Sequence, residues 1–254
     1  MRETILVLDF GGQYNQLIAR RVRECGVYCE VRPFTMTAEE IRRMAPKGII
    51  LTGGPNSVYD MTSPHGDPAI FDMGIPVLGI CYGAQLMAFT LGGKVATAPV
   101  SEYGRTEVTI LKKTGLLADM ADETVTWMSH TDYIEKMPDG FEATACTPVC
   151  PVAAMENEER KLYGLQFHPE VTHSEEGMKM LSAFVYRSCG CSGDWKMNSF
   201  VEEMISAVRS KVGSGSPLRP QRRRRFVGSG GTHVKSSRQA ADLRICRSRT
   251  SEKG

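Results

Sequence analysis

The first hundred residues alternate continuous apolar runs with segments whose apolar residues recur every three or four positions. The runs at 4–10 (TILVLDF) and 75–80 (IPVLGI) lack polar alternation, which is typical of strands buried on both faces. Between them, 14–25 has apolar residues at helical spacing and stops at Gly26. This alternation predicts an α/β fold with a mostly parallel central sheet flanked by helices.

Other elements complete this part of the pattern. The helix expected at 37–45 begins at Thr37, whose side chain can cap it, and Glu40 completes a capping box. The run at 48–55 (GIILTGGP) predicts a strand that enters a glycine turn. The remaining expected elements are a strand at 27–34 and a helix at 82–91 that ends at Gly92 and Gly93.

Beyond residue 100 the predicted strands are shorter, and apolar residues alternate with polar ones, as in strands with one exposed face. After Val212 the periodicity disappears, and Gly, Ser, Arg and Pro dominate. The elements expected before that point are strands at 107–111, 125–130 and 142–147, a hairpin over 152–167 that turns at ENEER, and amphipathic helices at 175–189 and 199–212.

Charge is distributed unevenly along the 254 residues. The whole chain has 31 Lys and Arg against 29 Asp and Glu, but residues 213–254 have 11 against 2, a net +9. The preceding residues therefore have 20 against 27, a net −7, and give no electrostatic reason to expect nucleic acid as a partner. We expect 213–254 to be a disordered basic tail, because it is poor in apolar residues.

The composition favours a cytoplasmic protein without a membrane partner. No apolar stretch approaches the roughly 20 residues of a membrane span, and the N-terminus lacks the features of a signal peptide. Eight cysteines are scattered without disulfide-framework spacing, so we expect reduced thiols. The pairs Cys146/Cys150 and Cys189/Cys191 do not have zinc-knuckle spacing, and no metal is expected.

A candidate nucleophile, Cys81, lies in GICYGAQ (79–85) between a buried strand and a helix, flanked by Gly79 and Gly83. This is the G-x-nucleophile-x-G elbow with cysteine in the central position. The turn would raise Sγ above the sheet at a helix N-terminus, which stabilises a thiolate and offers backbone N–H groups to an oxyanion. A buried structural cysteine in a glycine turn is the alternative interpretation.

The candidate general base is His168, which stands two residues before Glu170. Side chains two residues apart on an extended segment point the same way, so Glu170 can orient His168 toward the thiol. The alternative is an incidental His-Pro-Glu at a strand end. A rival base, His130, precedes Asp132 by two residues, and we place both in the substrate pocket.

Three motifs together resemble the class I (triad) glutamine amidotransferases in their order and separation. They are LTGGP (51–55), GICYGAQ (79–85) and YGLQFHPEV (163–171). The resemblance covers residues 4 to about 189, and three dispersed motifs in one strand–helix frame are more specific than any one of them.

This resemblance implies that Cys81 is the nucleophile, His168 the general base and Glu170 its orienter. Cys81 would attack the glutamine side-chain amide to give a γ-glutamyl thioester and ammonia, and water activated by His168 would release glutamate. The resemblance also implies that Gly54 and the backbone N–H of Tyr82 stabilise the oxyanion and that Gln85 contacts the glutamine. Ser129 and His130 match the segment whose backbone binds the α-carboxylate. Gly53 and Asp132 complete the candidate substrate-binding set.

Two segments resemble one branch of this family. They are ILVLDFGGQYNQLIARRVRE (5–24) and SHTDYI (129–134). In that branch the ammonia passes to an ATP pyrophosphatase domain or subunit that activates xanthosine monophosphate. The complete enzyme then uses ATP and magnesium, whereas this chain itself is expected to hold no cofactor.

The resemblance divides the chain into an amidotransferase domain at 1–190, a linker and first helix of a truncated ATP pyrophosphatase domain at 191–212, and the tail at 213–254. A Ser-Gly-Gly-Val-Asp-Ser-Ser phosphate loop should follow the helix, but the tail reads PLRPQRRRRFVGSGG there. One base further on, a CGN arginine codon followed by C or T encodes only Gly, Ala, Val or Asp. In this shifted frame residues 218–228 can read SALSGGVDSSV, and the shifted reading of 235–253 also resembles the ATP pyrophosphatase domain. We therefore expect a frameshift between about Val212 and Leu218.

Two alternatives stay open at this point. The first is the glutaminase subunit of another class I amidotransferase, such as anthranilate synthase, although LDFGGQY (8–14) argues against it. The second is a non-catalytic module of the same fold, or a cysteine peptidase or hydrolase with a similar elbow.

Overall fold

The computed structural model describes residues 2–197, 205–206 and 210. The tail at 213–254, with its predicted disorder and frameshift, lies outside the described residues, as does most of the helix expected at 199–212. No described helix has both the length and the apolar character needed to cross a membrane.

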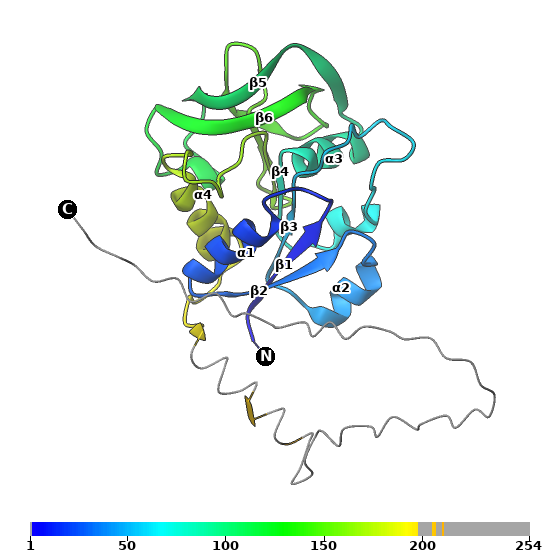
Figure 1. Cartoon of the computed structure of the whole chain (residues 1–254), viewed down its shortest axis with the longest axis vertical. Helices are drawn as coiled ribbons and strands as arrows, with labels where there is room; N and C mark the ends of the chain where they lie inside the picture. The colour runs from blue at the N-terminus through cyan, green and yellow to red at the C-terminus, as the bar shows by residue number, and fades with distance from the viewer. Residues whose placement is uncertain (1, 198–204, 207–209, 211–254) are drawn as a thin grey trace, which may run out of the picture. The chain divides into compact units, whose positions relative to one another are not determined.

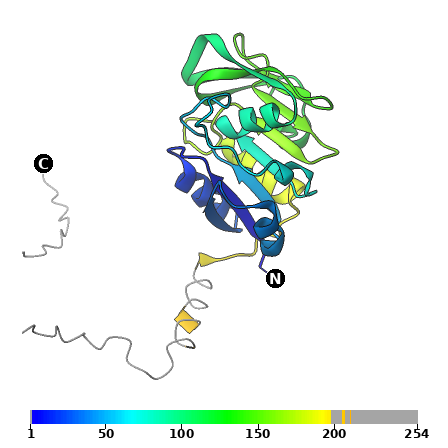
Figure 2. The same cartoon turned by 90° about the vertical axis from the view of Figure 1, so that its right-hand side faces the viewer.

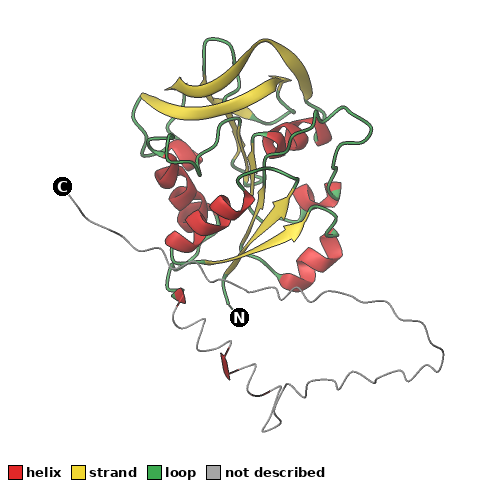
Figure 3. Cartoon of the chain, in the orientation of Figure 1, coloured by secondary structure: helices red, strands yellow, loops and turns green. Residues whose placement is uncertain are grey.

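A nine-stranded sheet in the order β2-β1-β3-β4-β9-β8-β7-β5-β6 runs through the described part of the chain (Figure 3). Its first five strands are parallel: β2 (Tyr28–Pro33), β1 (Thr4–Asp9), β3 (Gly48–Leu51), β4 (Val77–Ile80) and β9 (Leu162–Leu165). Antiparallel pairing adds β8 (Ala154–Asn157), β7 (Glu142–Cys146), β5 (Lys94–Ile110) and β6 (Glu123–Lys136). The expected α/β class is confirmed, with the parallel strands grouped in one half of a mixed sheet.

Helices cover both faces of the parallel strands (Figures 1 and 2). On one face lie α1 (Asn15–Glu24) and α4 (Gly177–Ala183), and α4 continues as a π-helix over Phe184–Ser188. On the other face lie α2 (Ala38–Met44) and α3 (Tyr82–Thr90). Two short 3-10 helices, at Pro68–Asp72 and Gly115–Leu117, lie in the connections.

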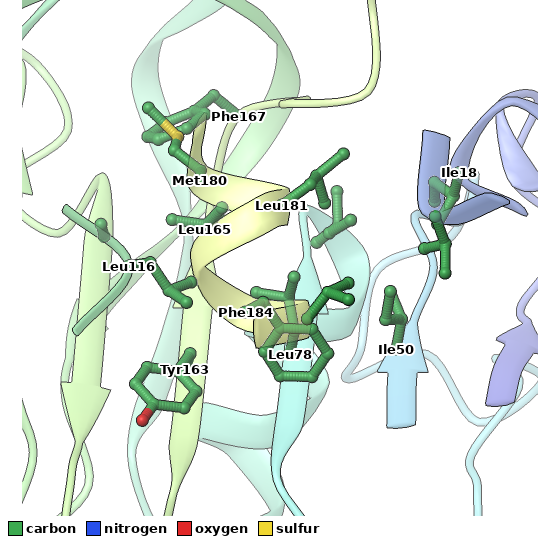
Figure 4. Close-up of a cluster of buried hydrophobic side chains, with 14 of the residues drawn as sticks. Ile18, Ile50, Leu78, Leu116, Tyr163, Leu165, Phe167, Met180, Leu181 and Phe184 are labelled. Carbon is green, nitrogen blue, oxygen red and sulfur yellow. The ribbon is translucent and has the colours of Figure 1, made fainter. Parts of the chain in front are cut away.

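Alternate residues of each parallel strand enter two separate hydrophobic cores. In β1, Ile5 and Val7 belong to the core beneath α1 and α4, whereas Leu6 and Leu8 belong to the core beneath α2 and α3. In the first core, α4 packs against β4 and β9, as Figure 4 shows for Met180, Leu181, Phe184, Leu78 and Leu165. Each fully buried leucine or isoleucine stabilises the fold by about 1.5–3 kcal/mol, so both faces hold the strand ends in place.

Helix α2 begins as the sequence predicts. The Thr37 side chain accepts a hydrogen bond from the Glu40 N–H, and the Glu40 carboxylate accepts one from the Thr37 N–H. This capping box satisfies two N–H groups that the helix itself leaves without acceptors.

The largest difference from the predicted elements lies in β5 and β6. Short strands were expected at 107–111 and 125–130, but β5 has 17 residues and β6 has 14. The two strands pair with each other along most of their length, with register shifts between Lys94 and Val95 and between Thr97 and Glu102. Much of this ribbon is exposed, so its length depends on hydrogen bonds between strands that the apolar pattern does not reveal.

Candidate active site

A cavity of about 460 Å³ lies where the chain leaves the carboxyl ends of the parallel strands. Its walls come from residues 11–15 after β1, 53–57 after β3, Cys81 after β4 and His168 after β9, and from the β5–β6 ribbon. Ligands bind to open α/β sheets at this edge, and the volume is that of a small-molecule pocket. Every predicted site residue except Tyr82 lines this cavity.

The elbow at Cys81 has the strained backbone that the glycine pattern predicts. Cys81 has φ 52° and ψ −108°, a conformation that is costly for a residue with a side chain. A Cβ on Gly79 would lie 2.6 Å from the Ala84 nitrogen, and one on Gly83 would lie 2.4 Å from the Leu51 carbonyl oxygen. Both positions therefore require glycine, and together they allow α3 to start directly after β4.

His168 and Glu170 meet as the sequence predicts, although they lie in a turn after β9 rather than in a strand. His168 Nδ1 lies 2.7 Å from Glu170 Oε1, and the Glu170 side chain is fully buried. The His168 N–H donates to the Trp127 carbonyl oxygen at 2.9 Å, and the Ser174 hydroxyl donates to the His168 carbonyl oxygen at 2.6 Å. His168 is thus held by hydrogen bonds to both its ring and its backbone.

The charge state of His168 follows from its two neighbours. Burial by itself lowers the pKa of His168, but the hydrogen bonds and negative charges of Cys81 and Glu170 outweigh burial and raise the pKa well above its ordinary value. The imidazole lies beside Cys81, since a Cβ on Gly53 would lie 3.3 Å from the His168 ring and 3.7 Å from the Cys81 Cβ. His168 is therefore suited to keep a proton beside the cysteine sulfur while that sulfur carries negative charge.

Replacing Glu170 with glutamine is expected to lower the pKa of His168, because the buried negative charge that favours the imidazolium is lost. The measurement is an NMR titration of the His168 ring signals. Glu175→Gln is the matched control, since that carboxylate is exposed and pairs with Arg105. An unchanged His168 titration in Glu170→Gln would show that the carboxylate does not set the charge of the ring.

The predicted oxyanion groups lie close together, since a Cβ on Gly54 would lie 3.2 Å from the Tyr82 ring. Gly53 and Gly54 line the cavity, and a Cβ on Gly53 would lie 3.3 Å from the His168 ring. The Tyr82 side chain points elsewhere, because its hydroxyl donates to the Pro64 carbonyl oxygen and its ring packs 5.8 Å from Phe10. Only the Tyr82 backbone N–H remains available, in the first turn of α3, where N–H groups have no acceptor within the helix.

The other substrate-binding candidates form a hydrogen-bonded wall of the cavity. Gln85 Nε2 donates to the Asp132 carbonyl oxygen at 2.7 Å, and the Cys81 thiol donates to the Ser129 carbonyl oxygen at 3.7 Å. The Asp132 carboxylate accepts hydrogen bonds from three hydroxyl groups, those of Ser57, Tyr59 and Thr97. Asp132 thereby ties the loop after β3 to the β5–β6 ribbon.

His130 lines the cavity, but its ring nitrogens face other protein groups. Nδ1 lies 3.0 Å from the Asp132 carbonyl oxygen, and Nε2 lies 3.2 Å from the Glu102 carboxylate. Burial lowers the pKa of His130, and the charge of Glu102 opposes that effect. His168, which lies beside Cys81, is therefore the better placed base.

A second group of one cysteine, one histidine and one glutamate lies near this wall. Ligand atoms of Glu102, His130 and Cys150 lie within 4.8 Å of one another, the only such group among the described residues. Cys150 does not line the cavity and is fully buried, and burial raises the pKa of its thiol to about 12. A protonated thiol without access to the cavity is not a nucleophile for a bound substrate.

Sequence reasoning missed three residues that contact this site. Gln166 Nε2 lies 3.8 Å from the Cys81 sulfur, and its position two residues before His168 was the available signal. The Tyr14 ring meets the His168 ring edge-on, with centroids 5.3 Å apart. Glu102 gave no signal, because its contact with His130 depends on the pairing of β5 with β6.

The family of the chain follows from comparisons with known proteins. Residues 6–188 match the family Glutamine amidotransferase class-I, so the chain belongs to the class I glutamine amidotransferases. Two of its relatives are described as GMP synthase (glutamine-hydrolysing): one from Clostridium botulinum (strain Alaska E43 / Type E3), 64% identical over 217 residues, and one from Clostridium perfringens (strain 13 / Type A), 59% identical over 213 residues. These matches cover 85% and 84% of this chain but 42% of each relative, so the chain spans less than half of their length.

Solved structures show the same fold. A protein from Thermoplasma acidophilum that is described as a GMP synthase subunit superposes with a TM-score of 0.69 at 28% identity, covering 81% of this chain and 98% of the other. A glutamine amidotransferase from Thermotoga maritima superposes with a TM-score of 0.60 at 18% identity, covering 75% of this chain and all of the other, and supports the fold alone.

Proposed function

We propose that this chain is the glutamine-hydrolysing part of a GMP synthase, with Cys81 as nucleophile, His168 as general base and Glu170 as its orienter. The observation that carries this proposal is Cys81 on its strained elbow, beside a histidine that Glu170 holds at 2.7 Å, at the wall of a 460 Å³ cavity. A nucleophile, its base and the group that orients the base are the parts that acyl transfer requires.

In the first half of the reaction, the Cys81 thiolate attacks the side-chain amide carbon of glutamine. The carbonyl oxygen gains negative charge, which the N–H groups of Gly54 and Tyr82 stabilise. The His168 imidazolium gives its proton to the amide nitrogen, the C–N bond breaks, and ammonia leaves. Cys81 then carries a γ-glutamyl thioester.

In the second half, water replaces the sulfur. Neutral His168 takes a proton from the water as it attacks the thioester carbon, and the C–S bond breaks. Glutamate leaves, and Cys81 and His168 return to their starting charge states. One glutamine and one water thus give one glutamate and one ammonia.

The remaining candidates would recognise the rest of the glutamine. We assign the backbone of Ser129 and His130 to the α-carboxylate, and Gly53, Gln85 and Asp132 to the same pocket. The Asp132 carboxylate supplies a negative charge at the cavity wall, which would suit an α-ammonium group. An amide without these two groups would therefore bind weakly.

The ammonia would be used by an ATP pyrophosphatase portion that activates xanthosine monophosphate with ATP and magnesium and forms GMP in the cytoplasm. Support for this acceptor comes from the two clostridial relatives, which are described as GMP synthases. No cofactor, nucleic acid or membrane partner is assigned to this chain.

The test is glutamate release from glutamine by the purified 254-residue chain, followed by glutamine-dependent GMP formation when an ATP pyrophosphatase portion of the clostridial type is added. We expect turnover of glutamine and no turnover of asparagine. Glutamine hydrolysis that supports anthranilate synthesis but not GMP formation would favour the other subunit class. Absence of hydrolysis in both settings would leave a non-catalytic module.

We further propose the domain division at 190 and 212 and the frameshift before Leu218. The two relatives match 217 and 213 residues of this chain, close to the length of the segment that precedes the arginine run. Sequencing the gene over codons 210–222 is expected to reveal one inserted or missing base whose correction restores the Ser-Gly-Gly-Val-Asp-Ser-Ser loop. An unchanged reading frame would contradict this proposal and leave the basic tail as part of the natural protein.

A further inference from the structure

Glu102 is a buried carboxylate that has no part in the proposed chemistry. It lies in β5 directly opposite His130 of β6, just after the register shift that follows Thr97. Glu102 is 8% exposed and His130 is 5% exposed. A buried carboxylate is costly unless other groups bind it, so its partners indicate what it does.

The partners of Glu102 fix the His130 ring. Oε1 accepts a hydrogen bond from the Thr147 hydroxyl at 2.8 Å, and Oε2 lies 3.2 Å from His130 Nε2. The other ring nitrogen, Nδ1, faces the Asp132 carbonyl oxygen at 3.0 Å, and because a carbonyl only accepts, Nδ1 donates. Neither Oε2 nor Nε2 has a hydrogen bond to another described group, so each depends on the other and on a proton between them.

The ring in turn holds the backbone that lines the cavity. The Asp132 carbonyl oxygen that meets His130 Nδ1 also accepts the hydrogen bond from Gln85 Nε2 at 2.7 Å. Gln85 Nε2 also donates to Gln166 Oε1 at 3.2 Å, and Gln166 Nε2 reaches the Cys81 sulfur. A continuous set of contacts therefore leads from Glu102 through His130 and Gln85 to Gln166, which contacts the nucleophile.

We propose that Glu102 is a positioning residue: by holding the His130 ring it fixes the backbone of residues 129–132, and it thereby sets the affinity for glutamine. This inference rests on the proposed function of the same cavity. The reactivity of Cys81 depends mainly on other groups, namely its glycine elbow and the His168–Glu170 pair. Loss of Glu102 therefore affects KM more than kcat.

Two other roles for this group are less consistent with its geometry. A second nucleophilic site would need Cys150 to reach a substrate, but Cys150 is fully buried away from the cavity. A metal site would need Glu102 as a ligand, but its Oε1 already accepts the Thr147 hydrogen bond and its Oε2 faces an imidazole that needs a partner. The Glu102–His130 contact accounts for both buried groups without an ion.

The experiment compares Glu102 variants of the full chain. Glu102→Ala is expected to raise KM for glutamine by about tenfold while kcat stays within about threefold. Glu102→Gln keeps the shape and can still bond the ring, so it should restore most of the affinity. In a Cys81→Ala background, which cannot turn over, calorimetry should show the same roughly tenfold weakening of glutamine binding by Glu102→Ala.

The matched control is Glu156→Ala. Glu156 is also a buried carboxylate, 6% exposed, and burial raises its pKa. Its partners on the neighbouring strands, Glu142 and Tyr163, do not line the cavity. Its truncation should lower Tm without raising KM, which separates positioning from a purely structural role. If Glu102→Ala does not fold, Glu102→Asp serves instead, because it keeps the charge but is one methylene too short to hold the ring.

Three results would overturn the proposal. They are an unchanged glutamine affinity in folded Glu102→Ala, an equal rise in KM for Glu156→Ala, and a stoichiometric zinc ion in the purified protein that Cys150→Ala removes. The proposed function fails separately. A wild-type chain that binds glutamine but does not hydrolyse it would contradict the glutaminase assignment, and the calorimetric comparison would still decide the role of Glu102.

Discussion

Replacing Cys81 with alanine is expected to lower glutamine hydrolysis by about 10³-fold or more, because no other group can form the thioester. The fold should survive, because the change removes one sulfur atom from the edge of a cavity and leaves Gly79 and Gly83, which allow the elbow, unchanged. The measurement is kcat/KM for glutamate release, together with loss of labelling of residue 81 by a glutamine-like electrophile.

The control for this experiment is Cys150→Ala. Both cysteines stand near a histidine and a glutamate, so composition alone does not distinguish them. Cys81 lines the cavity beside His168, whereas Cys150 is enclosed and burial raises the pKa of its thiol to about 12. Cys150→Ala should therefore leave a folded enzyme with most of its turnover. The reverse pattern, with activity lost only in Cys150→Ala, would assign the chemistry to the other group.

The second large effect is expected for Gly83→Ala. The added Cβ would lie 2.4 Å from the Leu51 carbonyl oxygen and 2.8 Å from the Leu51 carbonyl carbon, and backbone atoms at these distances cannot rotate away. Helix α3 would have to move off β3, at a cost of about 3 kcal/mol. A shift of about 1 Å at Cys81 would also reduce turnover by about 10²-fold. Chemical denaturation and kcat measure the two effects.

Gly66→Ala is the matched control for steric crowding. A Cβ there would meet the Phe10 ring at 3.4 Å, an ordinary contact, and Gly66 does not have a left-handed backbone. Its unfolding free energy should change by less than about 1 kcal/mol. If Gly83→Ala proved equally mild, the close approach of α3 to β3 would not be needed to form the elbow.

The parallel half of the fold could be predicted because its information is local. Strands β1, β3 and β4 are buried on both faces and read as continuous apolar runs, and Thr37 with Glu40 marks the start of α2. The extent of β5 and β6 could not be predicted, because it depends on pairing between distant segments and on register shifts within β5. Residues 213–254 remain a sequence prediction.

The residues of the candidate site could likewise be predicted where they lie in local motifs, but not where they depend on the pairing of distant strands. Cys81, His168 and Glu170 lie in compact motifs next to strand ends, and the structure brings them together. Tyr82 shows the limit of a motif, because the first turn of α3 sends its ring toward Phe10 and away from the cavity. Glu102 could not be found from the sequence, since it meets His130 only through the ribbon.

The pairing of β4 with β9 has a consequence for how this protein tolerates change. Ile80 is aligned with Leu165, and the Cys81 N–H donates to the Leu165 carbonyl oxygen at 2.7 Å. The distance between the thiol and the imidazole therefore depends on the spacing of two adjacent strands, which lie about 4.8 Å apart in any sheet. Loops elsewhere can lengthen without changing the distance between β4 and β9. One residue inserted between Leu165 and His168 would lengthen the turn after β9, move the imidazole away from its place beside Cys81 and leave the sulfur without its proton donor.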